Sequence, residues 1–233
     1  LWLNFNCLKR IFSSIFTGES LNLLELSNNE IEEIELETVS NLNRLYLNYN
    51  KIKKIDSNRL KGLEKLEILE LNYNEISNIQ LEHFSNLKEL CLANNKLNRI
   101  TTETFKRLVN LEKLNIEFNV IEEIESNSFE SLSKLRELEL SNNKLHRIDR
   151  ETFCGLSNLE RLNLDHNEIK EIGEKQFEAL TKLRDLRFRY NKLERFRVKG
   201  FEKLERLDLD HNFLCDISLE NASNLKEIYI GYN

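Results

Sequence analysis

The stretch that decides the fold is residues 135–156, which read LRELELSNNKLHRIDRETFCGL. Its apolar residues and one Asn keep fixed spacings: Leu135, Leu138, Leu140, Asn143, Leu145, Ile148, Phe153 and Leu156. The block after it keeps the same spacings, with Leu159, Leu162, Leu164, Asn167, Ile169, Ile172, Phe177 and Leu180. So does the block before it, with Leu111, Leu114, Ile116, Asn119, Ile121, Ile124, Phe129 and Leu132. A fixed period of this length predicts a chain built from stacked structural repeats.

The Asn of this frame recurs along the whole chain, at spacings of 21 to 24 residues. Its positions, the predicted structural Asn ladder, are Asn6, Asn29, Asn50, Asn74, Asn95, Asn119, Asn143, Asn167, Asn191, Asn212 and Asn233. We therefore expect residues 1–233 to form a single domain of about eleven repeats, truncated at both ends with its caps missing, because solenoids need polar caps over their last coils.

Each position of the frame has a physical role. Leu-x-Leu alternation predicts a short strand with its Leu side chains inside the coil, and successive strands stack as a parallel sheet. The Asn amide is suited to bond backbone groups of neighbouring turns that would otherwise be buried without partners. A column of Phe residues fills the convex side; its members are Phe105, Phe129, Phe153, Phe177 and Phe201, with Leu60 replacing Phe once. No repeat can bury its apolar face alone, so the stack is the folding unit.

Over its full length the sequence resembles the leucine-rich-repeat family. The 24-residue repeats are similar to the type common in extracellular animal proteins. The 21-residue repeats end differently, as in Ile34-Glu-Leu36, Ile79-Gln-Leu81 and Ile217-Ser-Leu219. The mixture looks like insect Toll-type ectodomains and mosquito leucine-rich-repeat immune proteins, although this chain lacks Pro and the Cys-rich caps. The resemblance implies an α/β leucine-rich-repeat solenoid, a horseshoe with a parallel sheet on the concave face and short helical or irregular turns on the convex face.

Composition narrows the classes of partner. The net charge of −6 disfavours nucleic acid, which needs a basic surface. The apolar opening, residues 1–8, is followed at once by Lys9 and Arg10 and is too short for a membrane span. We expect protein partners, no nucleic acid, no membrane contact by this segment and no cofactor.

The four cysteines do not form a motif. Cys154 and Cys215, the closest pair in sequence, lie two to three coils apart, too far for disulfide geometry. We expect no disulfide, with Cys215 as a small buried residue and Cys91 pointing out of the concave sheet. Free thiols favour an intracellular protein. Asn221-Ala-Ser223, the one N-glycosylation sequon, favours a secreted one.

No catalytic or metal-binding motif is present. The chain has no His-Glu-x-x-His, no Cys-x-x-Cys and no glycine-rich phosphate loop. His166 follows Asp165 and His211 follows Asp210, with Arg189 and Tyr190 at the matching positions between them. We interpret Asp165, Arg189 and Asp210 as a cross-strand ladder that relieves repulsion between like charges. The expectation is that the segment is not an enzyme and has no metal site.

The concave face is the predicted binding surface. Residues between the two strand leucines and residues just before each ladder Asn are expected to point outward, and they include many aromatic side chains. One predicted patch consists of Tyr46, Tyr49, Glu70 and Tyr73. A second, zwitterionic patch consists of Asp165, His166, Arg187, Arg189, Tyr190, Asp208, Asp210 and His211. Phe118 lies between the two patches. Strand propensity and stacking along the sheet also favour aromatic residues at such positions.

The leading hypothesis is therefore an extracellular or cell-surface recognition module. By resemblance, such a module serves innate immunity or receptor function and binds proteins through its concave face. The alternative is an intracellular scaffold or regulatory subunit on the same solenoid. A third reading makes the segment the recognition domain of a larger enzyme. Fold alone does not choose among these readings.

Overall fold

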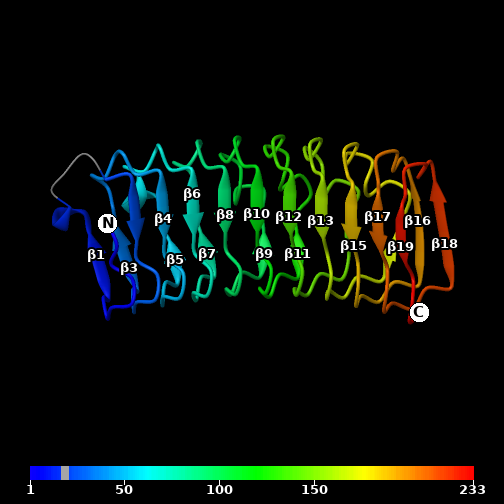
Figure 1. The fold of residues 1–233 in the computed structure, drawn as a ribbon, viewed down its shortest axis with the longest axis horizontal. Helices are drawn as coiled ribbons and strands as arrows, with labels where there is room; N and C mark the ends of the chain where they lie inside the picture. Colours follow the sequence, from blue (N-terminus) through cyan, green and yellow to red (C-terminus); the bar gives the residue numbers. More distant parts are fainter. Residues whose placement is uncertain (17–20) are drawn as a thin grey trace.

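The computed structural model describes residues 1–16 and 21–233, which wind into a row of coils running from left to right in Figure 1, each adding one strand to a long sheet. This sheet is parallel and has ten strands in the order β19-β17-β15-β13-β12-β10-β8-β6-β4-β2. Its strands are β2 (Leu23–Glu25), β4 (Arg44–Tyr46), β6 (Ile68–Glu70), β8 (Glu89–Cys91), β10 (Lys113–Asn115), β12 (Glu137–Glu139), β13 (Arg161–Asn163), β15 (Asp185–Arg187), β17 (Arg206–Asp208) and β19 (Glu227–Tyr229). A bridge from Trp2 to Glu25 extends the sheet at its N-terminal edge.

The register of the sheet follows the repeat frame. Each strand has its Leu or Ile in the middle, as in Leu114, which pairs with Leu90 on one side and Leu138 on the other. These three side chains are buried, and the residues on either side of each Leu face away from the core. The predicted concave parallel sheet is confirmed, because the Leu-x-Leu alternation leaves only one face of each strand apolar.

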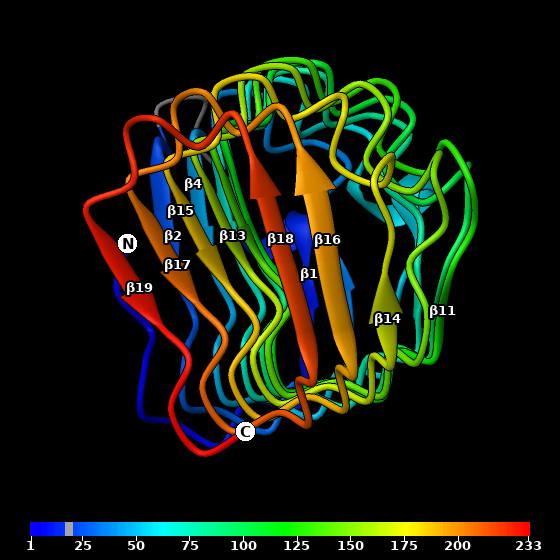
Figure 2. The same ribbon diagram turned by 90° about the vertical axis from the view of Figure 1, so that its right-hand side faces the viewer.

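The opposite side of each coil, here called the outer side, carries shorter parallel strands that the sequence analysis did not predict. Figure 2 shows them as a second layer facing the long sheet. They are β1 (Arg10–Phe12) with β3 (Glu33–Glu35), β5 (Lys54–Ile55) with β7 (Asn78–Ile79), β9 (Arg99–Ile100) with β11 (Glu123–Ile124), and β14 (Glu171–Ile172) with β16 (Arg195–Lys199) and β18 (Asp216–Glu220). Turns and two short 3-10 helices, η1 (Ser13–Ile15) and η2 (Ser57–Leu60), complete this side.

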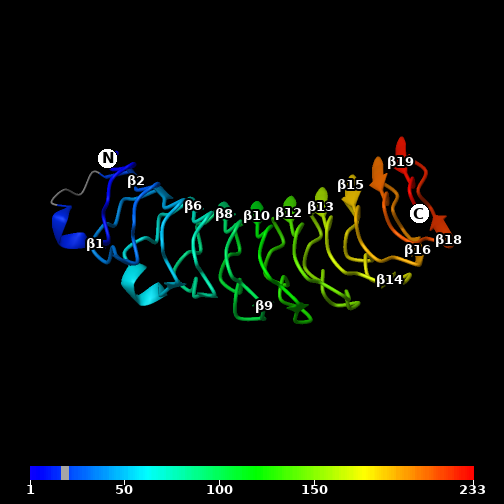
Figure 3. The same cartoon turned by 90° about the horizontal axis from the view of Figure 1, so that it is seen from below.

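The core fills the space between the two layers. Leu and Ile side chains form one continuous buried cluster from Ile11 to Leu209, and partly buried side chains of the last coil, such as Leu219 and Leu225, pack against it. The predicted Phe column runs through it, and consecutive rings stack: the ring centroids of Phe105 and Phe129 are 6.0 Å apart, those of Phe129 and Phe153 6.4 Å, and those of Phe153 and Phe177 5.8 Å. Phe rings on the outer side are wider than Leu side chains on the sheet side, so the row of coils bends. Figure 3 shows the resulting shallow arc, with the long sheet on its concave side.

Within the described residues, no helix has the length and apolarity that crossing a bilayer requires.

Candidate binding surface

The Asn ladder fixes the end of each concave strand. Asn119 is buried, and its Nδ2 donates to the carbonyl oxygens of Ile116 in its own coil (3.1 Å) and Leu92 in the preceding coil (2.9 Å). Its Oδ1 accepts from the backbone N–H of Leu97 at 3.0 Å. One side chain therefore satisfies three buried backbone groups in two coils, which holds the chain where it turns out of the sheet.

The residue before each ladder Asn has a left-handed backbone, which the sequence analysis missed. Its φ lies between 50° and 57° in every coil: Phe5, Asn28, Tyr49, Tyr73, Asn94, Phe118, Asn142, His166, Tyr190, His211 and Tyr232. We call this row of residues the edge strip. Asn and His tolerate this conformation better than most residues, whereas bulky side chains rarely adopt it. The Asn at three of these positions was the available sequence signal.

Aromatic rings in the edge strip stack on one another from coil to coil. Tyr49 and Tyr73 are nearly parallel, with ring centroids 4.3 Å apart. A longer stack follows near the C-terminal end of the sheet. There the centroids are 4.4 Å apart between His166 and Tyr190, 4.2 Å between Tyr190 and His211, and 4.5 Å between His211 and Tyr232. Since the faces of these rings cover each other, the ring edges and polar tips are what the strip presents to a partner.

The structure brings the first predicted patch together. Tyr46 pairs with Glu70 across neighbouring strands, and the Tyr49–Tyr73 stack lies just beyond the strand ends. Asn48 lies between them: its Nδ2 donates to Glu70 Oε2 at 2.6 Å, and its Oδ1 accepts from the backbone N–H of Asn72 at 2.9 Å. The patch thus consists of two exposed Tyr rings beside a fixed carboxylate.

The second patch is also contiguous, but its charges pair differently from the prediction. The Arg189 guanidinium contacts Asp208 (Nε to Oδ1, 3.7 Å) and not the two predicted carboxylates. Asp165 Oδ1 instead accepts from the backbone N–H of Arg189 at 2.6 Å, and Asp210 Oδ1 accepts from that of Gly231 at 2.6 Å. The predicted Asp–Arg–Asp side-chain ladder is therefore replaced by carboxylates that cap the backbone of the next coil, because an unpaired strand N–H needs a partner more than a solvated Arg does.

Asp208 departs from the prediction in a second way: it lies at the outward-facing strand position between Arg187 and Tyr229, but it is buried. It lies between Arg189 and Arg206, whose Nη2 is 3.8 Å from Asp208 Oδ2. Burial raises the pKa of Asp208, and the hydrogen bond from the Asp210 backbone N–H and the two guanidinium groups partly offset that rise. Its role is to hold the two Arg side chains, each of which also covers a Tyr ring: Arg189 lies 5.5 Å from the Tyr190 centroid and Arg206 lies 5.0 Å from that of Tyr229.

Two further ionisable groups in this patch are perturbed. Burial raises the pKa of Asp165 to about 6, against the hydrogen bond from the Arg189 backbone. Burial and the Arg189 charge lower the pKa of His166. Arg187, another residue of the predicted patch, binds Asp185 through two guanidinium nitrogens, at 3.1 and 2.7 Å.

Comparison with known proteins identifies the family. The profile described as "Leucine rich repeat" matches residues 40–90, 85–145, 110–169, 133–193 and 157–214, which together span more than half of the chain. The chain belongs to the leucine-rich-repeat family. No curated protein sequence gives a significant match.

Solved structures show the same fold. The leucine-rich repeat domain of APL1B superimposes with a TM-score of 0.83 at 19% identity, covering 99% of this chain and 68% of that one. Toll from the Drosophila Toll–Spatzle complex gives 0.81 at 24% identity, covering 94% of this chain and 32% of Toll. The Leptospira interrogans protein LIC12759 gives 0.79 at 24% identity, covering 97% and 64%. This leucine-rich-repeat chain thus resembles the insect Toll and APL1 domains and spans less than two thirds of LIC12759 and of Toll.

A charge pattern unforeseen in the sequence analysis borders the concave face of this leucine-rich-repeat solenoid. In seven successive coils the first strand residue and the residue before it have opposite charges, and the order reverses from each coil to the next: Lys88-Glu89, Glu112-Lys113, Arg136-Glu137, Glu160-Arg161, Arg184-Asp185, Glu205-Arg206 and Lys226-Glu227. We call this the checkerboard. Its ion pairs join neighbouring coils, for example Arg184 with Glu205 at 2.9 Å and Lys113 with Glu89 at 3.7 Å. Because its charges are paired internally, the checkerboard offers a partner less electrostatic attraction than the edge strip and its Arg neighbours.

The cysteines are not paired with one another. All four are free thiols. Cys91 is half-buried on the sheet, where burial raises the pKa of its thiol to about 12, so it is a poor nucleophile. The prediction that Cys215 is buried is wrong: it is exposed, and its Sγ donates to the Glu194 carbonyl oxygen at 3.3 Å. Among the described residues, no group of three or more His, Cys, Asp or Glu side chains is placed to hold a metal ion.

Proposed function

We propose that this chain is a recognition module that binds a protein partner along its edge strip and the adjoining concave face. The observation that carries the proposal is the aromatic content of the edge strip. Phe118, Tyr49, Tyr73 and Tyr190 are each between 42% and 50% exposed, at a backbone conformation that disfavours them. Core packing does not require large apolar side chains at these positions.

The free-energy cost of placing aromatic residues in the edge strip can be judged by comparing coils of the same molecule. Asn28, Asn94 and Asn142 occupy the strip in three coils, so the fold accepts Asn there. A bulky residue in the left-handed region costs on the order of 1 kcal/mol or more. Ring stacking returns about 0.5–1.5 kcal/mol for a pair, but Phe118 has Asn94 and Asn142 as its neighbours in the strip and no stacked ring. Exposed aromatic side chains kept at such a cost are typical of interfaces, where Tyr and other aromatic residues supply most of the binding energy.

The structural neighbours support the same class of function. Toll is seen in complex with Spatzle, and the leucine-rich-repeat protein FLRT2 in an octameric complex with Latrophilin 3 and Unc5D. By analogy with these proteins, we propose that the chain acts outside the cell or at its surface, in a receptor or innate-immune role. The free thiols are the observation that favours the alternative, an intracellular leucine-rich-repeat scaffold.

The test replaces strip aromatics with the residue that the fold itself uses there. A panel of candidate extracellular proteins is screened by surface plasmon resonance against wild type, Tyr73→Asn, Phe118→Asn and the double variant Arg187→Ala/Arg189→Ala. Hot-spot losses of about 2 kcal/mol weaken binding roughly thirtyfold. Val109→Asn is the matched control, because Val109 is an apolar side chain on the outer side, 46% exposed.

The thermal midpoint separates binding from folding. Phe118→Asn is expected to fold at least as stably as wild type, since it removes an unfavourable backbone conformation without emptying the core. A partner that no longer binds the edge-strip variants but still binds Val109→Asn supports the proposal. A partner that binds all variants equally refutes it and moves the contact surface to the outer side.

A further inference from the structure

The sequon lies at the end of the outer layer. Strand β18 ends at Glu220, and Asn221 follows it with φ 64°, a conformation that Asn tolerates. Asn221 and Ser223 are exposed, whereas Ala222 is half-buried and packs against the core. The turn therefore presents both polar groups of the Asn-x-Ser motif to solvent while its middle residue anchors the turn.

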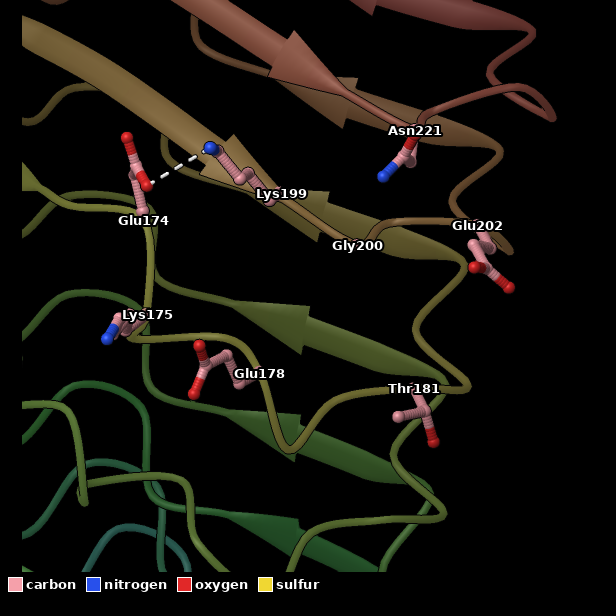
Figure 4. A pocket seen from close by; sticks show the side chains of 8 residues that line it. All are labelled: Glu174, Lys175, Glu178, Thr181, Lys199, Gly200, Glu202 and Asn221. Carbon is pink, nitrogen blue, oxygen red and sulfur yellow. Dashed lines mark ion pairs between the residues drawn. The ribbon is translucent and has the colours of Figure 1, made fainter.

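A polar hollow adjoins the Asn221 side chain (Figure 4). It has a volume of about 450 Å³, and its rim includes Glu174, Thr181, Lys199, Gly200 and Glu202. Gly200 is the neighbour of Asn221 in the preceding coil, and a Cβ built on it would meet no heavy atom within 4 Å. Lys199 lies at one edge of the hollow, with its Nζ 3.4 Å from Glu174 and 3.3 Å from Glu220. The space beside Asn221 is thus open and lined by groups that donate or accept hydrogen bonds.

We infer that Asn221 is an N-glycan acceptor and that the first sugars of its glycan lie over this hollow. In the transfer, Asn221 Nδ2 forms a bond to the anomeric carbon of a lipid-pyrophosphate-linked oligosaccharide. The bond from that carbon to the pyrophosphate oxygen breaks, and the lipid pyrophosphate leaves with the bonding electron pair and takes up the proton that the amide nitrogen loses. Sugar hydroxyls need hydrogen-bonding partners, which Lys199, Thr181 and the carboxylates of the rim supply.

The position of this glycan fits the proposed binding surface, and the inference rests on the extracellular location proposed above. Figure 2 shows that β18, in the outer layer, and β19, in the concave sheet, end at opposite sides of the coil. The edge strip lies at the side where β19 ends. A glycan on Asn221 covers charged outer surface and leaves the concave face and the edge strip free. The glycan also blocks contact between the outer side of the last coils and another protein.

The experiment expresses the chain behind a cleavable signal peptide in a eukaryotic cell line and measures the intact mass of the secreted protein before and after peptide-N-glycosidase treatment. Wild type and Ser223→Thr, which keeps the motif, are expected to carry one glycan. Ser223→Ala and Asn221→Gln are expected to lose it. Since the sequence has one sequon, any glycan mass has a single source. Secreted, folded wild type without the mass shift overturns the inference.

Placement over the hollow has its own readout. Amine-reactive labelling of Lys199 and Lys175, followed by peptide mass spectrometry, is expected to be slower in glycosylated wild type than in Ser223→Ala. Labelling of Lys65, which lies many coils away, serves as the internal control and is expected to be unchanged. Equal labelling of Lys199 in both proteins overturns the placement. Because neither measurement needs a partner, failure of the proposed binding function is distinguishable from failure of this inference.

Discussion

The four coils between Asn95 and Asn191 differ from the two that follow, between Asn191 and Asn233. The ladder Asn residues are 24 apart in the first group and 21 apart in the second. In the longer coils the outer side holds Phe rings, turns and two-residue strands such as β9 and β11. In the shorter coils it becomes a regular sheet, with β16 and β18 paired over five residues.

The three-residue difference in length between the two groups of coils changes only the outer side. Arg195–Lys199 alternates exposed and buried side chains, and Phe196 packs edge-on against Phe188, with ring centroids 5.9 Å apart. Asn212 in a short coil makes the same bonds as Asn119 in a long one, to two carbonyl oxygens at 2.9 and 3.0 Å and from one N–H at 3.1 Å. The concave strand and its ladder are thus the same in both groups of coils, while the outer side differs between them.

The largest difference is expected from truncating the Phe column. Phe153 has a stacked ring on each side, so Phe153→Ala leaves a large cavity and costs about 4 kcal/mol. Phe201→Ala is expected to cost less, about 3 kcal/mol, because the equivalent residue of the next coil is the small Ala222. Urea denaturation measures both. Equal losses would show that the rings in the long coils do not depend on one another.

Substitutions in the Asn ladder are expected to cause the next largest loss of stability. The loss should be the same in long and short coils. Asn119→Leu and Asn212→Leu each leave three backbone groups without partners, at about 3 kcal/mol. The exposed Asn98→Ala is the control, with a change below about 0.5 kcal/mol. If Asn212→Leu proves much milder than Asn119→Leu, the two groups of coils also differ on the concave side.

Two glycines with positive φ test how closely the outer sides are packed. At Gly155, in a long coil, a Cβ would lie 2.4 Å from the Glu130 carbonyl oxygen, so Gly155→Ala should cost about 2 kcal/mol or more. At Gly200, in a short coil, a Cβ meets only open space, and the backbone strain alone costs about 1 kcal/mol. Thermal unfolding of the two variants measures the difference. A reversed order would contradict the packing described for the two groups.

The smallest predicted effect concerns pH and lies in the longer coils, at Asp165. Asp165 has a folded-state pKa of about 6, above its value in an unfolded chain, so the folded protein binds this proton more tightly. Its stabilising contribution is therefore present at low pH and is lost as pH rises through 6. Asp165→Asn should be more stable than wild type at pH 8, by about 1 kcal/mol after allowance for partial exposure, with the gap closing by pH 4. A gap that is constant with pH would contradict the shifted pKa.

The sequence predicted the parts of the fold that one residue type controls. Leu-x-Leu fixed the register of Leu90, Leu114 and Leu138, and the Asn positions marked the strand ends. It did not predict the left-handed backbone at Tyr190, because Tyr has no intrinsic preference for that region. The pairing of Arg189 with Asp208 was also missed, since the choice among several nearby carboxylates depends on which of them the backbone already uses.

The strands of the short coils were readable in principle. Arg195–Lys199 alternates polar and apolar residues over five positions, which is a strand pattern. The sequence analysis treated the outer side as irregular because most coils do have turns there. Coil length alone does not separate the two cases, because the 21-residue coil between Asn74 and Asn95 has only the two-residue strand β7. The alternation itself was the signal.

The checkerboard has a consequence for how such a chain can change in length. Its charge order reverses with every coil, so inserting or deleting one repeat within residues 88–227 brings like charges face to face, whereas two repeats restore the alternation. Each surface pair contributes only about 0.2–1 kcal/mol, but a mismatch alters two columns at once. The charge pattern therefore tolerates an even number of inserted or deleted repeats better than an odd number. Such a chain lengthens or shortens most easily by two coils at a time.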